Sequence, residues 1–118
     1  MLQASYNSLR RGEIWLVELD PVVGREQAKR RPALVITPHR AGSVVDTVTI
    51  VPITSTSRPH ISSRIPIAPP EGGLSVPGDI LTEHVRTIST LRLVRRMGFA
   101  SGKTVERVRS TLRRLLGL

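Results

Sequence analysis

The sequence predicts a small, mainly β protein that is closed by one C-terminal α-helix. Short apolar runs alternate with Pro- and Gly-containing turns as far as residue 100, and the hydrophobic period then changes to that of a helix. A chain of 118 residues has room for one domain. These observations favour a small, strongly bent sheet or barrel with a helix packed on it.

The expected strands are short and end at turn residues. They cover residues 13–19, 33–37, 48–53, 63–68, 79–88 and 95–100. In the first, Trp15, Val17 and Leu19 should face one side and the residues between them the other. Pro52 predicts an edge strand or a bulge, because proline cannot donate to a ladder. The run PPEGG at residues 69–73 predicts a mobile surface loop.

The closing helix is predicted by an apolar stripe that Ser101 or Thr104 can cap. The stripe consists of Val105, Val108, Leu112, Leu115 and Leu116. The opposite face carries Lys103, Arg107, Arg109, Arg113 and Arg114 against Glu106. Charges on a helix face usually keep it solvated, and we interpret this face in that way.

Composition limits the partners and the chemistry. The net charge of +9 favours a polyanion such as nucleic acid, or an acidic protein. Only Tyr6, Trp15 and Phe99 are aromatic, so contacts to RNA should depend on arginine and the backbone. The chain has no cysteine and no apolar run of about 20 residues, which fits a cytoplasmic protein without a membrane segment. We expect residues 1–9 to form an N-terminal extension and residues 10–118 the domain.

No metal or cofactor site is predicted. His39, His60 and His84 lie far apart and lack a paired spacing such as HExxH. There is also no G-x-S-x-G segment to present a nucleophilic serine. The remaining candidates for chemistry lie in residues 20–31 and at the end of the third expected strand.

The loop after the first strand places Glu26 among cations, namely Arg25, Lys29, Arg30 and Arg31. RNA can be cleaved without a metal ion, because its own 2′-OH can attack the adjacent phosphate. The enzyme must then accept a proton, stabilise the phosphorane oxygens and assist the leaving 5′-oxygen. Glu26, Arg31, Thr54 and Ser55 offer these functions. A salt bridge between Arg31 and Glu26, or a strand-end hydrogen bond of Thr54 to the backbone, would be the structural alternative.

Four patches in order resemble the MazF/PemK family of toxin endoribonucleases. They are RGEIWLVELDP (11–21), GREQAKRRPALVI (24–36), TIVPITS (49–55) and LTEHVRTIS (81–89), followed by the closing helix. The resemblance implies an SH3-like barrel with a C-terminal helix and a homodimer. It also implies metal-independent cleavage of single-stranded RNA to 2′,3′-cyclic phosphate and 5′-OH ends. A cognate acidic antitoxin would cover the RNA groove.

The resemblance also assigns roles to particular residues. The family's catalytic arginine falls on Arg31, its catalytic threonine on Thr54 and the acidic residue of its loop on Glu26. RNA-binding positions by the same resemblance, or by their place in the loop and strand end, are Arg25, Gln27, Lys29, Arg30, Ser55 and Arg86. His84 stands where many relatives have Gln, so no contact is carried over to it.

Two other classes of function compete with the ribonuclease. CcdB-type toxins share the fold but bind DNA gyrase and cleave nothing. A plain RNA- or DNA-binding module would also explain the charge. The presence of both Arg31 and Thr54 favours the ribonuclease over these alternatives.

Overall fold

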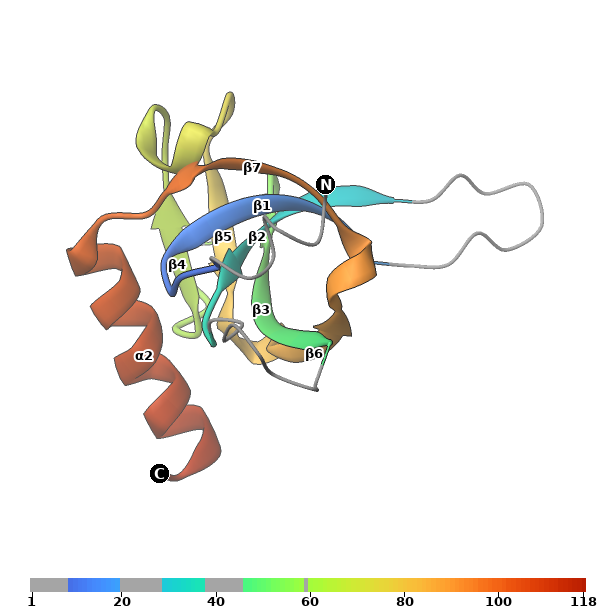
Figure 1. The fold of residues 1–118 in the computed structure, drawn as a ribbon. Helices are drawn as coiled ribbons and strands as arrows, with labels where there is room; N and C mark the ends of the chain where they lie inside the picture. Colours follow the sequence, from blue (N-terminus) through green and yellow to red (C-terminus); the bar gives the residue numbers. More distant parts are fainter. Residues whose placement is uncertain (1–8, 20–28, 38–45, 59) are drawn as a thin grey trace.

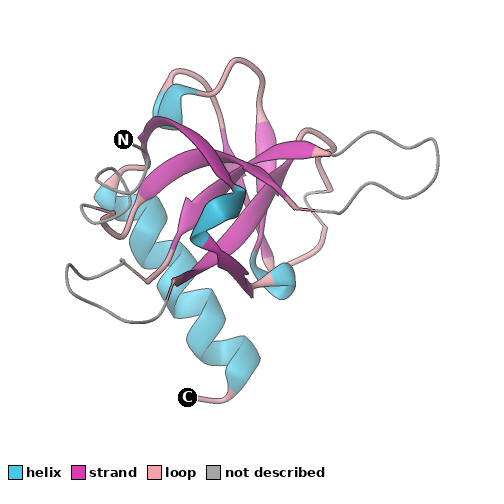
Figure 2. Ribbon diagram, turned by 45° about the vertical axis from the view of Figure 1, so that its right-hand side comes forward, coloured by secondary structure: helices cyan, strands magenta, loops and turns pink. Residues whose placement is uncertain are grey.

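The computed structural model describes residues 9–19, 29–37, 46–58 and 60–118. In this part of the chain a curled antiparallel sheet is accompanied by one α-helix, α2 (Figures 1 and 2). The strands are β1 (Glu13–Glu18), β2 (Arg30–Val35), β3 (Thr47–Thr54), β4 (Arg64–Ile67), β5 (Gly78–Leu81), β6 (Arg86–Ser89) and β7 (Leu93–Phe99). The helix α2 spans Gly102–Leu116, and 3₁₀ turns occupy η1 (Glu71–Gly73), η2 (Thr82–His84) and η3 (Thr90–Arg92). The predicted mainly β fold with a C-terminal helix is confirmed.

Strand β3 pairs with three other strands of the sheet, β2, β5 and β6. The strands run in the order β4-β5-β3-β2-β1-β7, and β6 pairs with the other half of β3. The single strand expected over residues 79–88 is therefore wrong, because the turn η2 divides it into β5 and β6. Thr82 anchors this turn, since its buried hydroxyl donates to the carbonyl oxygen of Ser63. A local pattern of apolar residues cannot show that two short strands pair with two halves of a third.

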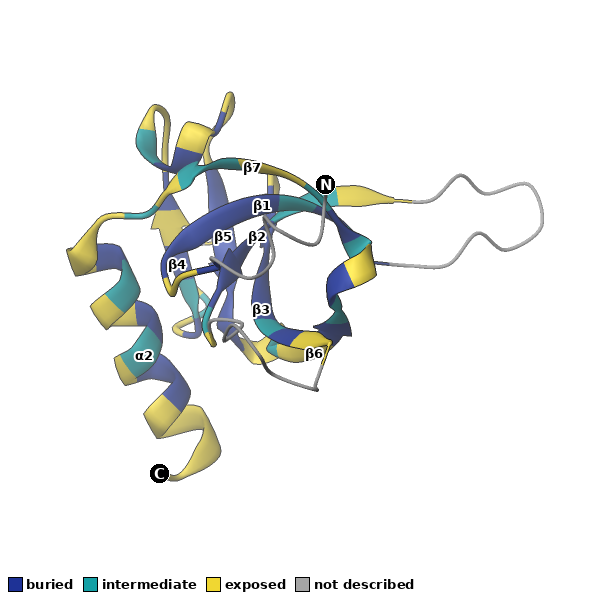
Figure 3. Ribbon diagram, in the orientation of Figure 1, coloured by how far each residue is buried: buried dark blue, intermediate teal, exposed yellow. Residues whose placement is uncertain are grey.

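Most of β1 is buried, as its dark-blue colour in Figure 3 shows, and its apolar residues divide between two core clusters. Trp15 and Val17 belong to one core cluster and Ile14 to the other, so the predicted alternation is confirmed. Leu9 is only 2% exposed and packs in the first cluster. Leu9, which belongs to the expected N-terminal extension 1–9, therefore contributes to this core.

The helix α2 buries only the first part of its apolar stripe. Val108 and Leu112 pack in the second core cluster, whereas Leu115 and Leu116 are exposed. Ser101 caps the start, because its hydroxyl accepts a hydrogen bond from the Thr104 N–H at 3.1 Å. In Figure 1 the C-terminal end of α2 extends away from the sheet. No helix in the described part of the chain is long and apolar enough to span a membrane.

The segment 69–73 lies at the surface, as predicted, with Pro69, Pro70 and Gly73 exposed. Its turn η1 packs closely on the sheet: a Cβ added to Gly72 would lie 2.3 Å from the Ile14 side chain. At Gly73 a Cβ would lie 2.1 Å from the Met97 carbonyl oxygen. The Glu71 carboxylate accepts a hydrogen bond from the Ser101 N–H at 2.8 Å. Glycine permits the close approach, and Glu71 joins η1 to the start of α2.

Pro52 lies in the central strand β3, and the predicted edge position was wrong. The Thr49 carbonyl accepts a hydrogen bond from the Ile36 N–H, so the peptide groups of Thr49 point toward β2. Successive residues of a strand point their peptide groups in alternate directions. The nitrogen of Pro52 therefore faces away from β2. On that side β6 pairs with β3 as far as Ile50, and β5 pairs from Ile53 onward. Proline is tolerated here because it falls in the gap between two partner strands.

Candidate functional site

The main cleft of the site opens where β2 and β3 stop pairing. Their register ends at Ala33 opposite Pro52, after which β3 continues with β5 and β2 continues with β1. The Val35 carbonyl accepts from Gly12 N–H beside β1, so by alternation the nitrogen of Pro32 faces β3. Pro32 has no N–H to extend the ladder, which gives a physical reason for the strands to separate here.

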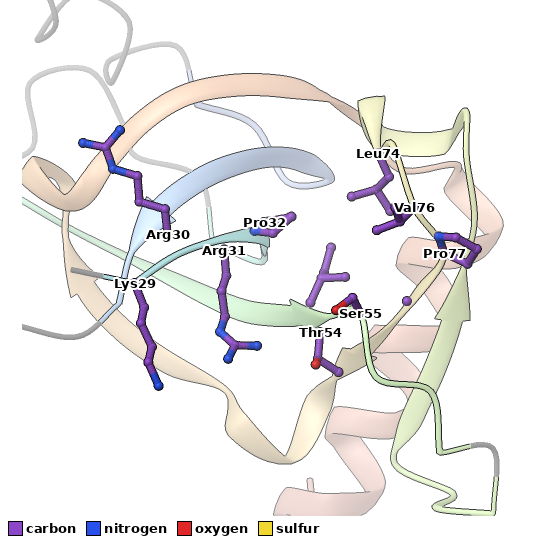
Figure 4. A pocket seen from close by; sticks show the side chains of 11 residues that line it. Lys29, Arg30, Arg31, Pro32, Thr54, Ser55, Leu74, Val76 and Pro77 are labelled. Carbon is purple, nitrogen blue, oxygen red and sulfur yellow. The ribbon is translucent and has the colours of Figure 1, made fainter. Parts of the chain in front are cut away.

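A pocket of about 350 Å³ occupies the opening (Figure 4). It is lined by Lys29, Arg30, Arg31, Pro32, Ile53, Thr54, Ser55, Leu74, Val76, Pro77 and Gly78. The same cavity is therefore lined by Thr54 and by four other predicted site residues, namely Lys29, Arg30, Arg31 and Ser55. The lining combines cations and hydroxyls with an apolar wall, as a site for a phosphate and an attached base requires.

The cations of β2 divide between its two faces. Arg31 and Lys29 point to one side in Figure 4, and Arg30 points to the other. Arg30 lies 2.8 Å from the Glu18 carboxylate, so its charge is partly neutralised. Within the described residues no carboxylate pairs with Arg31. Arg31 is thus the guanidinium that can best accept a phosphate group in this pocket.

Thr54 ends β3 and is 9% exposed. Its Oγ1 accepts a hydrogen bond from the Thr56 N–H at 3.2 Å, so the local hydrogen bond considered as an alternative is present. A hydroxyl can accept and donate at once, and its hydrogen is left to donate to a ligand. If the β2–β3 register were continued past its last pair, Ala33 and Pro52, Thr54 would lie opposite Arg31.

The neighbouring strand β5 borders the site, and this contact was not predicted from the sequence. A Cβ added to Gly78 would lie 2.2 Å from the Thr54 carbonyl oxygen. Asp79 pairs with Thr54 in the β3–β5 register and is 1% exposed. The turn residues Pro77 and Gly78 were visible in the sequence, but their approach to Thr54 depends on a long-range register.

Several predicted site residues lie elsewhere or outside the described part of the chain. Arg86 is exposed on β6, opposite Ile50, and does not line the pocket. Glu26, Arg25 and Gln27 fall in residues 20–28, outside the described residues. Ser55 lines the pocket beside Thr54.

Among the described residues, two carboxyl groups have a clearly shifted pKa, and both lie outside the pocket. Burial would raise the pKa of Glu83, but hydrogen bonds from its own backbone, Ser63 and Arg64, with the Arg64 charge, lower it from 4.5. Burial would likewise raise the pKa of Glu71, but hydrogen bonds from Thr104 and Ser101 lower it. Among the residues described, no three His, Asp or Glu side chains gather in a way that could hold a metal ion.

Two guanidinium groups, an ammonium and two hydroxyls around a cleft in a small, basic β-sheet define a protein equipped to bind a phosphodiester. Residues 10–116 match the family model of the PemK-like, MazF-like toxins of type II toxin–antitoxin systems. The chain belongs to this family.

Named relatives agree with this assignment. The chain is 33% identical over 115 residues to endoribonuclease MazF9 of Mycobacterium tuberculosis, covering 93% of this chain and 98% of that protein. It is 33% identical over 106 residues to endoribonuclease PemK of Escherichia coli, covering 90% and 74% respectively. A solved MazE–MazF structure from Deinococcus radiodurans (Form-II) is 29% identical, with a TM-score of 0.76, and covers 96% of this chain and 98% of that one.

Proposed function

We propose that this toxin cleaves single-stranded RNA in the cleft between β2 and β3, without a metal ion, to 2′,3′-cyclic phosphate and 5′-OH ends. The observation that carries the proposal is the convergence of Arg31 and Thr54 on one pocket at the point where the two strands separate. Its curated relatives in M. tuberculosis and E. coli are named endoribonucleases. Single strands are the favoured substrate because their unpaired bases can be splayed out and contacted.

In the proposed reaction the 2′-oxygen forms a bond to phosphorus while the bond to the 5′-oxygen breaks. Glu26 accepts the 2′-OH proton or orients Arg31, which can then itself take part in moving that proton. The Arg31 guanidinium stabilises the negative charge on the phosphorane, and the Thr54 hydroxyl donates to a non-bridging oxygen. A proton from solvent water, or the proton that Glu26 has accepted, then passes to the 5′-oxygen, which leaves as a 5′-OH.

The other predicted RNA-binding residues would contact the RNA on either side of the cleaved bond. Lys29 and Ser55 lie at the pocket and are suited to contact phosphates next to the scissile one. Arg86 is assigned to the same RNA path by the family resemblance, and Arg25 and Gln27 are assigned to it by their place in the loop. Arg30 also lines the pocket, but its pairing with Glu18 makes it a weaker contact than Arg31.

Purified protein should be incubated with matched single-stranded and duplex RNAs in EDTA, and in parallel with DNA gyrase. We expect the single strand to be cut at defined positions and the duplex to resist. Gyrase supercoiling should be unaffected. Intact RNA together with inhibited gyrase would contradict the proposal and establish the CcdB-type alternative.

The toxin is also proposed to act as a homodimer. Leu115, Leu116 and Leu118 are 46%, 58% and 87% exposed at the end of α2, an apolar surface that a second copy can cover. Sedimentation should show a dimer at micromolar concentration, and Leu116→Arg should shift it toward monomer. A wild-type monomer with full activity would contradict this part of the proposal.

The proposed cellular setting is the cytoplasm, with a cognate acidic antitoxin that covers the cationic cleft. The solved D. radiodurans structures include MazE–MazF complexes. The +9 charge of this chain suits an acidic, flexible inhibitor segment that orders as it binds.

A further inference from the structure

Asp79 is a buried carboxylate for which the proposed cleavage chemistry has no use. It lies on β5 between Thr54 of β3 and Pro66 of β4, and is 1% exposed. Burying a carboxylate is costly unless hydrogen bonds compensate for the lost water. Asp79 is therefore expected to accept hydrogen bonds from donors inside the protein.

Its partners belong to the turn that follows Thr54. The Asp79 carboxylate accepts a hydrogen bond from the Arg58 N–H at 2.7 Å and a longer one from the Ser57 hydroxyl at 3.5 Å. Hydrogen bonds to an ionised acceptor are stronger than neutral ones. Residues 57 and 58 are thus fixed to the same strand that pairs with Thr54.

The turn also restrains the orientation of the Thr54 hydroxyl. The Thr56 N–H, between the anchored residues and Thr54, donates to Thr54 Oγ1 at 3.2 Å. With that acceptor position occupied in a set direction, the hydroxyl hydrogen has fewer orientations and can be directed to a phosphate oxygen. Gly78, next to Asp79, allows β5 to approach the Thr54 carbonyl oxygen closely.

We propose that Asp79 is a positioning residue for cleavage, which acts through the turn 55–58 to orient the Thr54 hydroxyl. This inference rests on the proposed ribonuclease function. Removing the Asp79 charge would loosen the turn, and small displacements of a catalytic group reduce the rate more than they reduce substrate binding.

Glu83 provides a matched control because it makes a comparable set of bonds away from the cleft. Its carboxylate accepts from the Ser63 hydroxyl at 2.8 Å and from Arg64 Nε at 2.9 Å. These bonds hold the start of β4 and do not reach the turn 55–58. Loss of the Glu83 charge should therefore affect stability and leave catalysis unchanged.

The test is a double-mutant cycle on single-stranded RNA with Asp79→Asn, Thr54→Ala and the two combined. Asp79→Asn should lower kcat roughly tenfold or more with little change in KM. In the Thr54→Ala background it should cause no further loss, because the group that it orients is gone. Glu83→Gln should retain the wild-type kcat.

A second variant protects the test against a folding failure of Asp79→Asn. Arg58→Pro removes the N–H donor and leaves Asp79 in place, whereas Arg58→Ala retains that N–H. We expect the kcat loss for Arg58→Pro only. Independent, multiplicative effects of the Asp79 and Thr54 changes, or lower stability with normal kcat, would overturn the inference. A Thr54→Ala enzyme with normal activity would instead contradict the proposed function itself.

Discussion

Arg31 and Thr54 line one pocket, because β2 and β3, the strands that carry them, stop pairing beside these two residues. The sequence identified both residues by type and by resemblance, and it also showed Pro32 next to Arg31. It did not identify Gly78 or Asp79, since these reach Thr54 only through the β3–β5 register. Pairing between distant strands is set by the whole fold, so a residue whose role depends on it leaves no local pattern.

At the residue scale, Arg31→Ala and Thr54→Ala should each lower the rate of RNA cleavage by a factor of about 10² or more. Each removes one group that stabilises charge on the phosphorane. Two controls match them. Arg113→Ala removes an exposed guanidinium on α2, and Thr56→Ala removes a hydroxyl but keeps the N–H that reaches Thr54.

Single-turnover cleavage of a single-stranded RNA, with circular dichroism to verify folding, measures the effect. Both controls should keep near-normal rates. Folded Arg31 or Thr54 variants that cleave as fast as these controls would show that the catalytic group lies elsewhere.

At the element scale, patterns with local causes were predicted well. The alternation in β1 and the helical period of α2 appear in the sequence because each depends on one face meeting the core. The division of residues 79–88 into β5 and β6 was missed, and so was the packing of η1. Both depend on which distant elements they contact, and Pro- and Gly-rich composition alone cannot show that.

The bond between η1 and α2 predicts a specific response to acid. The pKa of Glu71 is lowered in the folded state, so its ionised form contributes stability that is present above about pH 4.5 and lost as pH falls below it. Glu71→Gln should lower Tm by roughly 3–5 °C at pH 7. The difference from wild type should shrink as pH falls further below 4.5, because wild-type Glu71 then becomes progressively protonated.

Thermal unfolding at pH 7 and pH 3 gives both values. Glu106→Gln is the control, because Glu106 lies 60% exposed on α2 and exposed ion pairs contribute little to stability. A Tm difference for Glu71→Gln that is equal at the two pH values would contradict an ionic role for this carboxylate.

At the scale of the whole molecule, the +9 charge should govern how fast the antitoxin binds. Charge reversal at Arg25 and Lys29 should slow association more than it speeds dissociation, because long-range attraction acts mainly before contact. Reversing Arg109 and Arg113 on α2 changes the net charge equally, away from the cleft, and should slow association less. Stopped-flow measurements over a range of salt test this, and association that does not vary with salt would contradict it.

The central claim is that the cleft between β2 and β3 cleaves RNA by attack of its own 2′-OH, without a metal ion. The most direct measurement is the identity of the ends left on a defined single-stranded RNA by purified protein in EDTA. We expect 2′,3′-cyclic phosphate and 5′-OH ends, and no cleavage where the 2′-OH at the cut site is replaced by hydrogen. A 5′-phosphate end, or activity that is lost in EDTA and restored by divalent ions, would contradict it.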